Sequence, residues 1–337
     1  MKSIKLFWLF SIALLLLTDV RAQVGINKLA QSTMNFQLVS ISPKASALGD
    51  AYYTLGKGAE SIFYNPAGLA EMKNNYEVVM DYTQWIADIN YVGGAFAYNM
   101  GNWGVVGLSI LNVDYGTIYG TQLDPSKSSA LGYIETGELS NIGAYSIGFS
   151  YAKSISEQFS IGGNIRYVAQ NLGDNTFMYT DGSTKYQKNN AAKIVFDAGV
   201  KYKTGFHDFS FGMAIRNFSS NIKREAIDEQ LPLAFTMGAA INALGFVMDS
   251  KEQALYVAVD FLHPNNYSDR VNLGLEYRFM QMFALRGGYQ TNRDIASWSA
   301  GLGVNTNLAG YDVEINYSIS KMEVFDNVNR VSVNLAF

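Results

Sequence analysis

The residue types that carry most enzyme chemistry are scarce in this sequence of 337 residues, which has no cysteine and only two histidines. His207 falls in an expected short turn and His263 in an expected long loop, at opposite ends of the strands described below. Two groups so far apart can neither act as a catalytic pair nor share a metal ion. Glycine pairs such as Gly162-Gly163 do not open a helix after a strand, as a phosphate-binding loop requires. We therefore expect no catalytic residue, no metal site, no cofactor and no enzymatic activity.

The composition points to a chain that meets lipid without membrane helices. Hydrophobic residues make up 48% of the sequence and aromatic residues 14%, while charged residues make up only 16%, against about 25% in soluble globular proteins. After Gln23 no run approaches the roughly 20 apolar residues that a membrane helix needs. The apolar residues must therefore be spread by alternation. The net charge of −4 offers no basic surface for nucleic acid.

The first 22 residues have the pattern of a secretory signal peptide. Lys2 and Lys5 precede an apolar run over 6–17, and the segment ends in an alanine at position 22. The run is too short to span a bilayer comfortably. We expect residues 1–22 to be removed and the mature chain to start at Gln23.

Residues 76–337 show repeated period-2 alternation. In the last segment Val331, Val333 and Leu335 share one face, and Ser332 and Asn334 share the other. Fourteen such segments can be counted, at 76–84, 88–99, 103–112, 142–153, 158–171, 192–204, 207–217, 231–243, 254–263, 270–280, 282–290, 296–306, 311–320 and 329–337.

Apart from 85–87, which is short where a long loop is due, and 244–253, which is long for a turn, the connections between these segments alternate between short turns and long loops. The long loops include 113–141, 172–191 and 218–230. A soluble β-sandwich, the alternative, has no reason to keep that rhythm. The sequence predicts a 14-stranded antiparallel β-barrel in lipid, in the outer membrane of a Gram-negative bacterium, closed by pairing of the first and last strands.

Residues 23–75 do not alternate and are rich in small and polar residues. Asn65 suits a helix N-cap and Pro66 the first helical position, so a short helix is expected over 66–72. A fourteen-stranded barrel is too wide for its own side chains to fill. We expect this segment to form a plug, or hatch, inside the barrel; the alternative is a loosely attached periplasmic tail.

The same segment resembles a known family. The string from Ser46 to Tyr53, followed by Ile62 to Ala70 with Asn65, Pro66, Ala67 and Gly68, is similar to the N-terminal signature of the PorV/PorQ family. That family belongs to the wider group of FadL-like, long-chain fatty-acid transporter barrels. The resemblance implies a fourteen-stranded barrel with an N-terminal hatch. It also implies two functions: a non-enzymatic component of type IX protein secretion, or a transporter of hydrophobic small molecules with a sideways opening.

Two further patterns bear on that choice. The apolar phase slips at Gly93 and Gly94, and again at Val105 and Val106, which predicts either a wall kink that forms a sideways opening or an ordinary bulge. The long loops carry aromatic residues suited to protein contacts, namely Tyr115, Tyr119, Tyr133, Phe177, Tyr179 and Tyr186. The assignable inward positions are polar and argue against a wide apolar pocket. We therefore favour protein partners of a secretion machinery over a hydrophobic ligand.

Overall fold

The computed structural model describes residues 32–124, 130–178, 183–224, 227–248, 250, 252–293 and 298–337. The predicted signal peptide lies outside the described residues. The helices are short, with three to six residues each: η1 (Asn35–Leu38), α2 (Pro43–Ala47), η2 (Ala59–Phe63), η3 (Pro66–Glu71), η4 (Gly101–Trp103) and η5 (Ala243–Phe246). No helix in this part of the chain is long and apolar enough to cross a membrane.

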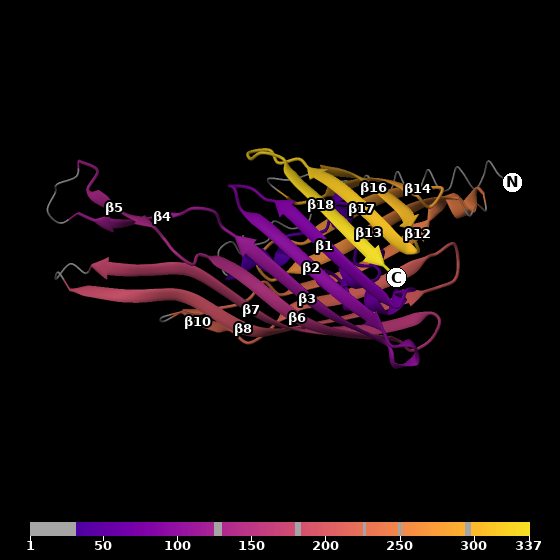
Figure 1. Ribbon diagram of the computed structural model, residues 1–337, viewed down its shortest axis with the longest axis horizontal. Helices are drawn as coiled ribbons and strands as arrows, with labels where there is room; N and C mark the ends of the chain where they lie inside the picture. Colours follow the sequence, from indigo (N-terminus) through magenta and orange to yellow (C-terminus); the bar gives the residue numbers. More distant parts are fainter. Residues whose placement is uncertain are drawn as a thin grey trace.

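Fourteen antiparallel strands form one closed barrel (Figure 1). They are β1 (Tyr76–Gln84), β2 (Asn90–Asn99), β3 (Val105–Asp114), β6 (Gly143–Ser154), β7 (Phe159–Met178), β8 (Thr184–Lys203), β9 (Ser210–Phe218), β12 (Ala234–Asn242), β13 (Gln253–Pro264), β14 (Arg270–Phe279), β15 (Phe283–Gln290), β16 (Trp298–Leu308), β17 (Tyr311–Ser320) and β18 (Val328–Ala336). Each of the fourteen predicted segments corresponds to one of these strands. The closure is also confirmed, because β1 pairs with β18 from Glu77↔Ala336 to Gln84↔Asn329.

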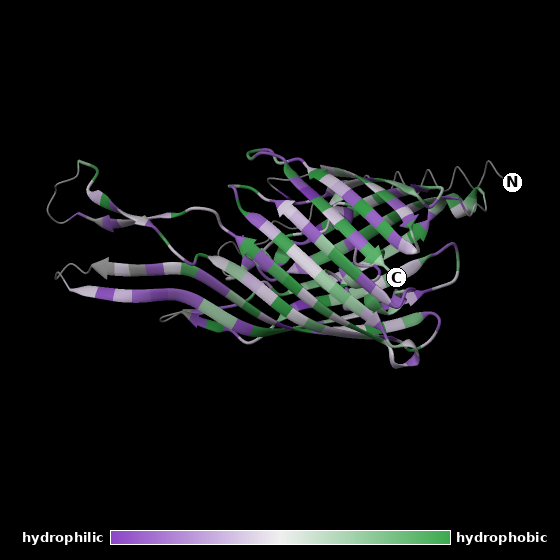
Figure 2. Cartoon of the chain, in the orientation of Figure 1, coloured by the Kyte–Doolittle hydropathy of each residue, from purple (hydrophilic) through white to green (hydrophobic). Residues whose placement is uncertain are grey.

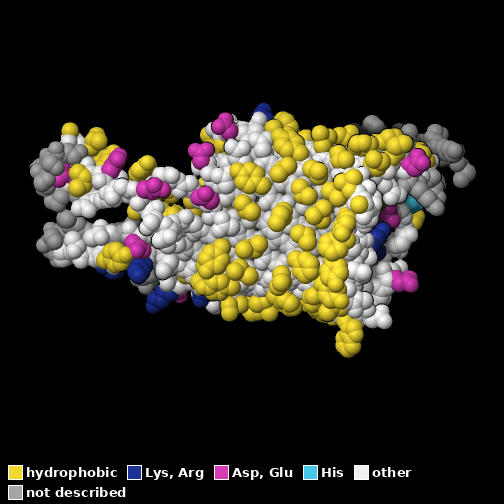
Figure 3. Space-filling view, in the orientation of Figure 1, with side chains coloured by type: hydrophobic (Ala, Val, Ile, Leu, Met, Phe, Trp, Pro, Cys, Tyr) yellow, Lys and Arg dark blue, Asp and Glu magenta, His cyan; other side chains and the backbone are white. Residues whose placement is uncertain are grey.

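The two faces of the strands differ as the alternation predicts. Leu273 and Val331 are 42% and 43% exposed on the outer wall, whereas Ser332 and Asn334 are buried. Figure 2 shows the resulting stripes of hydropathy along the barrel strands, and Figure 3 shows hydrophobic side chains over the wall with charged ones towards its two ends. This outer surface suits lipid, which offers no partner to polar groups.

The two ends of the barrel differ in the length of their connections. The chain ends beside short turns such as 280–282 and 309–310, which marks that end as periplasmic. The other end carries two small hairpins, β4 (Tyr119–Leu123) with β5 (Tyr133–Glu138) and β10 (Ile222–Arg224) with β11 (Ile227–Glu229).

The predicted loop at 172–191 is largely wrong, because most of it continues β7 and β8 into a two-stranded ribbon. Each of these strands has 20 residues, whereas a tilted strand crosses a membrane in about 9–11. The ribbon extends past the ends of the other barrel strands (Figure 1). Residues 172–191 carry no clear period-2 pattern because a ribbon in water has no lipid-facing side.

The predicted kink at Gly93, Gly94, Val105 and Val106 is also wrong. The pairings β1–β2 and β2–β3 run without a register shift, from Gln84↔Asn90 and Asn90↔Asp114 onwards. Burial alternates strictly along β2 and β3. The slip was only apparent, because Tyr91 and Val105 are apolar residues that face inwards. Tyr91 belongs to a buried cluster that contains Ile41, and Val105 to one that contains Ile62.

Residues 32–75, here called the N-terminal segment, precede β1. Hydrogen bonds or packing contacts join this segment to every one of the fourteen strands. A segment can touch all strands of a closed barrel only from within. It therefore lies inside the ring of strands, where many of its residues, among them Leu48, Ile62 and Leu69, are fully buried.

Candidate functional sites inside and outside the barrel

The residues Asn65 to Gly68 form a buried turn pressed against the inner wall. Pro66 starts η3 as expected, and the Asn65 Oδ1 atom accepts a hydrogen bond from the Ala67 N–H at 3.1 Å. The Asn65 Nδ2 atom donates to the carbonyl of Tyr53 at 3.0 Å and to that of Val200, on β8, at 3.2 Å. One side chain thus caps the helix, closes the N-terminal segment on itself and ties it to the barrel.

Two strand glycines make room for this turn. A Cβ atom on Gly199 would lie 2.0 Å from the Asn65 Oδ1 atom, and one on Gly162 would lie 2.4 Å from the Pro66 carbonyl carbon. Neither position can hold a larger residue unless the turn moves. The structure therefore assigns these glycines to close packing of the segment on β7 and β8.

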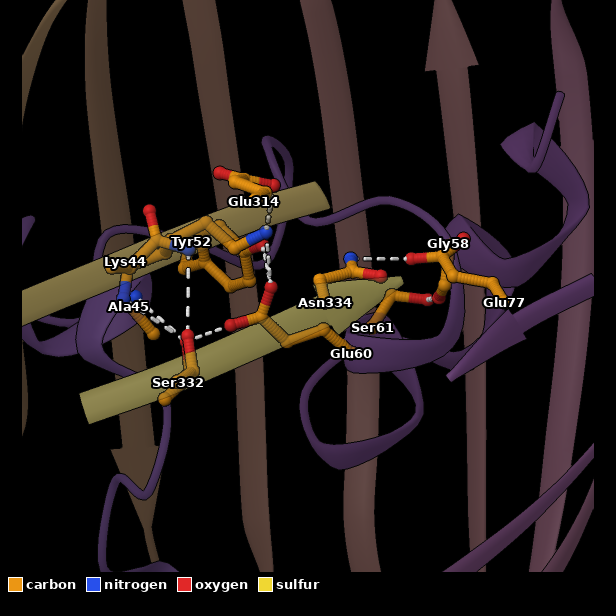
Figure 4. A network of polar contacts seen from close by, with 12 residues as sticks. Lys44, Ala45, Tyr52, Gly58, Glu60, Ser61, Glu77, Glu314, Ser332 and Asn334 are labelled. Atoms are coloured by element: carbon orange, nitrogen blue, oxygen red, sulfur yellow. Dashed lines mark hydrogen bonds and ion pairs between the residues drawn. The ribbon is translucent and has the colours of Figure 1, made fainter. Parts of the chain in front are cut away.

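A polar network joins the segment to the far wall (Figure 4). The Lys44 Nζ atom lies 2.6 Å from Glu60 Oε2 and 3.0 Å from Glu314 Oε2, on β17. Glu60, fully buried, also accepts hydrogen bonds from the hydroxyls of Ser42 and Tyr52. A buried carboxylate and ammonium persist only when paired in this way. The network therefore fixes α2 relative to η2.

A second set of ion pairs lies at the periplasmic end. Glu71 contacts the Nζ atoms of Lys201 at 2.6 Å, Lys203 at 2.7 Å and Lys57 at 3.8 Å. Burial opposes ionisation of Glu71, but the lysines outweigh it and hold the pKa of this carboxyl below its usual value. Lys201, 1% exposed, also donates to the Gly56 carbonyl at 2.8 Å. This set anchors the end of the segment to β8.

A third set lies in the extracellular half. Arg166 binds Asp197 through two hydrogen bonds of 2.7 Å, and also donates to Gln37 of the segment. Next to it, Met34 and Phe36 of the segment pack on an apolar part of the inner wall, made of Tyr91, Leu111, Val113, Val168 and Val195. The inner wall is thus not uniformly polar, and the segment covers its apolar part.

The cavities have opposite characters at the two ends. The one between the segment and the wall near Arg166 and Leu111 holds about 20 Å³, room for about one water molecule. A cavity of about 500 Å³ opens at the periplasmic end, and its lining includes charged side chains of both signs, among them Lys57, Glu77, Glu276 and Arg278. In the described part of the chain no group of His, Asp and Glu side chains is arranged to hold a metal ion.

Three of the six predicted partner-loop aromatics are exposed at the extracellular end. Tyr119, Tyr133 and Tyr186 are exposed at 62%, 39% and 60% on β4, β5 and the ribbon. Tyr115 is instead partly buried against the apolar inner cluster, and its hydroxyl accepts a hydrogen bond from Gln170. Phe177 lies on β7 rather than in a loop, and Tyr179 lies outside the described residues.

Sequence reasoning missed the partners of the motif. Gly199 and Lys201 face the segment from β8, and Glu71 ends η3. The sequence pattern that could have pointed to these partners is the set of inward-facing positions of β8, where Asp197, Gly199 and Lys201 alternate with outward-facing residues. It shows that a charge or a glycine faces inwards, but not what it meets.

Comparison with known proteins places the chain among outer-membrane barrels. Residues 127–326 match the family model described as "Type IX secretion system membrane protein PorP/SprF". None of the curated proteins matches the sequence. The resemblance noted above was to PorV/PorQ, so it agrees with this match in the secretion system and differs in the family.

Solved structures similar to this chain are FadL-like barrels. The Pseudomonas putida toluene transporter TodX has a TM-score of 0.56 and 10% identity, over 88% of this chain and 97% of the other. The CymD monoaromatic hydrocarbon channel has a TM-score of 0.54 and 14% identity, over 89% and 98%. A Pseudomonas aeruginosa FadL homologue has a TM-score of 0.53 and 11% identity, over 89% and 98%. At these identities the likeness concerns the fold.

Proposed function

The chain belongs to the PorP/SprF family of type IX secretion system membrane proteins, and we propose that it serves secretion by binding an exported protein with its extracellular strands and loops, without catalysing a reaction. The observation that carries the proposal is the build of the extracellular end. There β7 and β8 continue as a ribbon beyond the barrel, and the β4–β5 hairpin projects from the same end (Figure 1). Tyr119, Tyr133 and Tyr186 are exposed on these elements, and tyrosine is a preferred anchor residue in protein interfaces.

The interior supports the same proposal. The N-terminal segment is held by the three polar sets around Glu60, Glu71 and Arg166. We propose that it acts as a plug that keeps the barrel closed. A closed barrel can present a partner-binding surface without letting solutes through.

Transport of a hydrophobic small molecule is the second candidate. It is favoured by the FadL-like fold and by the apolar inner wall around Leu111 and Val168. In this structure Met34 and Phe36 occupy that wall, and the adjoining cavity holds about 20 Å³. A transporter would need the N-terminal segment to move, and the continuous pairing of β2 with β3 leaves no sideways opening between these strands.

The test compares two sets of tyrosine variants in the producing bacterium. Replacing Tyr119, Tyr133 and Tyr186 with alanine should abolish surface display of the exported partner while the barrel still folds. The matched control replaces the lipid-facing Tyr167, Tyr202 and Tyr289 with alanine. Normal export of the partner protein by bacteria that carry the Tyr119, Tyr133 and Tyr186 replacements would contradict the proposal. Stoichiometric fatty acid or hydrocarbon in the purified protein, with no protein partner, would favour transport.

A further inference from the structure

The outer part of β8 has one edge without a neighbouring strand. β8 pairs with β7 from Thr184 to Tyr202, but with β9 only from Phe196 to Lys203. In the described part of the chain no strand lies beside residues 184–194 on the β9 side. We call the β9 side of β8 at Thr184, Tyr186, Lys188, Asn190 and Ala192 the free edge of β8.

The hydrogen bonds at the base of β8 show which backbone groups point to this edge. The Lys203 N–H donates to the Gln158 carbonyl on the β7 side at 2.8 Å, and the Thr204 N–H donates to the Phe209 carbonyl on the β9 side at 2.9 Å. Neighbouring residues of an antiparallel strand alternate between its two sides. At both register shifts the extra residue lies on the partner strand, on β7 in one case and on β9 in the other. The alternation along β8 is therefore unbroken. Even-numbered residues therefore point their N–H and C=O groups at the free edge.

The fold produces this edge by turning the chain away. Next to Phe196 the β8–β9 register shifts, and Asn217 adopts a φ of 63°. Its N–H donates to Asp197 and its side chain to the Pro232 carbonyl, which fixes the bend. Beyond the bend Ile222 packs on the apolar inner cluster. β9 thus leaves the side of β8, and the edge is part of the fold rather than a frayed end.

The free edge lies in water. Tyr186, Lys188, Asn190 and Ala192 have exposed side chains, and these residues are less apolar than the lipid-facing Ile194 and Phe196 below them. Unpaired backbone groups are costly in lipid but tolerated in water. From Thr184 to Ala192 the edge spans nine residues, about 30 Å of extended chain. That length accepts one strand of a partner.

The charge of the edge indicates the chemistry of that strand. Residues 184–195 contain Lys185, Lys188 and Lys193 and no acidic residue. Lys223, on β10, is also exposed. It lies near this stretch, because Lys193 donates a hydrogen bond to Ser220, three residues before Lys223. The acidic residue opposite this stretch on β7 is Asp174, which accepts a hydrogen bond from Tyr186. Two copies of so basic an edge would repel each other, which disfavours a second copy of this chain.

We propose that the free edge of β8 binds an extended, acidic segment of the exported protein by strand addition. The backbone of that segment pairs with Thr184, Tyr186, Lys188, Asn190 and Ala192, and its carboxylates meet Lys188 and Lys193. The inference rests on the proposed function for the identity of the partner, and on the geometry of β8 for the mode of binding.

The experiment uses the full mature protein in lipid nanodiscs and a synthetic ten-residue peptide that alternates valine and glutamate. A valine–lysine peptide is the charge control. The N190P/A192P variant removes two edge donors without touching the ladder to β7, because these N–H groups point away from it. N190A is the matched control that keeps the donors. Unheated gel mobility checks that every variant forms a barrel.

The acidic peptide should bind, and it should slow amide hydrogen exchange at Tyr186, Lys188 and Asn190. N190P/A192P should weaken its binding at least tenfold, N190A less than twofold, and K188E/K193E should shift the preference to the lysine peptide. Equal binding of both peptides, unchanged binding by the proline variant, or protection of these amides by self-association without peptide would each overturn the proposal.

Export of the native partner separates the two proposals. If the tyrosine variants block export and N190P/A192P does not, the edge proposal fails and the proposed function stands. If the peptide binds as expected and neither set of variants affects export, the proposed function fails and the edge remains a binding site.

Discussion

The packing of Asn65 on Gly199 gives a sharp test of how the N-terminal segment is held. Replacing Gly199 with alanine puts a Cβ atom 2.0 Å from the Asn65 Oδ1 atom, and overpacking of this kind costs about 1–3 kcal/mol. Replacing Asn65 with alanine removes the cap on Ala67 and the bonds to Tyr53 and Val200, a loss of about 1–2 kcal/mol. In the double variant the Asn65 amide group, which the new Cβ atom would meet, is gone.

The double variant should therefore lose at least about 1 kcal/mol less than the sum of the single variants, because contacting sites couple. Gly163→Ala is the matched control: Gly163 lies on the neighbouring strand β7, and its Cβ atom would meet Asp197 O at 3.7 Å, an ordinary contact. The assay is guanidinium unfolding of the barrel in lipid vesicles, followed by gel mobility. Additivity within about 0.5 kcal/mol, or equal effects of the Gly199 and Gly163 changes, would refute this account of the contact.

Three further outcomes are expected. Leu273→Arg should destabilise the barrel by about 2–4 kcal/mol if the residue lies near the bilayer midplane, as measured by folding into vesicles; no effect would contradict the observed outward position of Leu273. Deletion of residues 42–72 should leave a folded barrel with higher ion conductance in planar bilayers, and unchanged conductance would show that the segment is not a plug. Because the folded pKa of Glu71 is lowered, its stabilising effect is present above its unfolded pKa and is lost as the pH falls through the folded value. Glu71→Gln should remove this acid dependence from the unfolding curve, and an identical curve would place the dependence elsewhere.

The barrel could be predicted from the sequence because lipid imposes a strong pattern. Every strand that crosses the membrane needs an apolar outer face, so residues such as Val331 and Leu335 alternate visibly. The pattern ends where lipid ends. Residues 172–178 and 184–191 continue β7 and β8 in water, where either face can be polar, and they were therefore read as a loop.

The inner wall was predicted less well, because its character depends on what fills it. Tyr91 and Val105 face inwards and are apolar because Ile41 and Ile62 of the N-terminal segment pack nearby. In the sequence they belong to the apolar phase that precedes each slip, and this phase predicts a kink that the structure does not have. Tyr115 was assigned to the solvent for a related reason, since its partner Gln170 lies 55 positions away in the sequence.

Buried side chains tie the N-terminal segment to β7 and β8, the two strands that extend beyond the barrel. Val200 binds Asn65, Lys201 binds Gly56 and Glu71, and Arg166 binds Gln37. A two-stranded ribbon is only marginally stable by itself in water, so its outer part depends on a base that does not twist or slip. The contacts of the segment with the inner face of β7 and β8 provide such a base. Packing inside the barrel thereby supports the geometry of the ribbon outside it, where we expect the partner to bind.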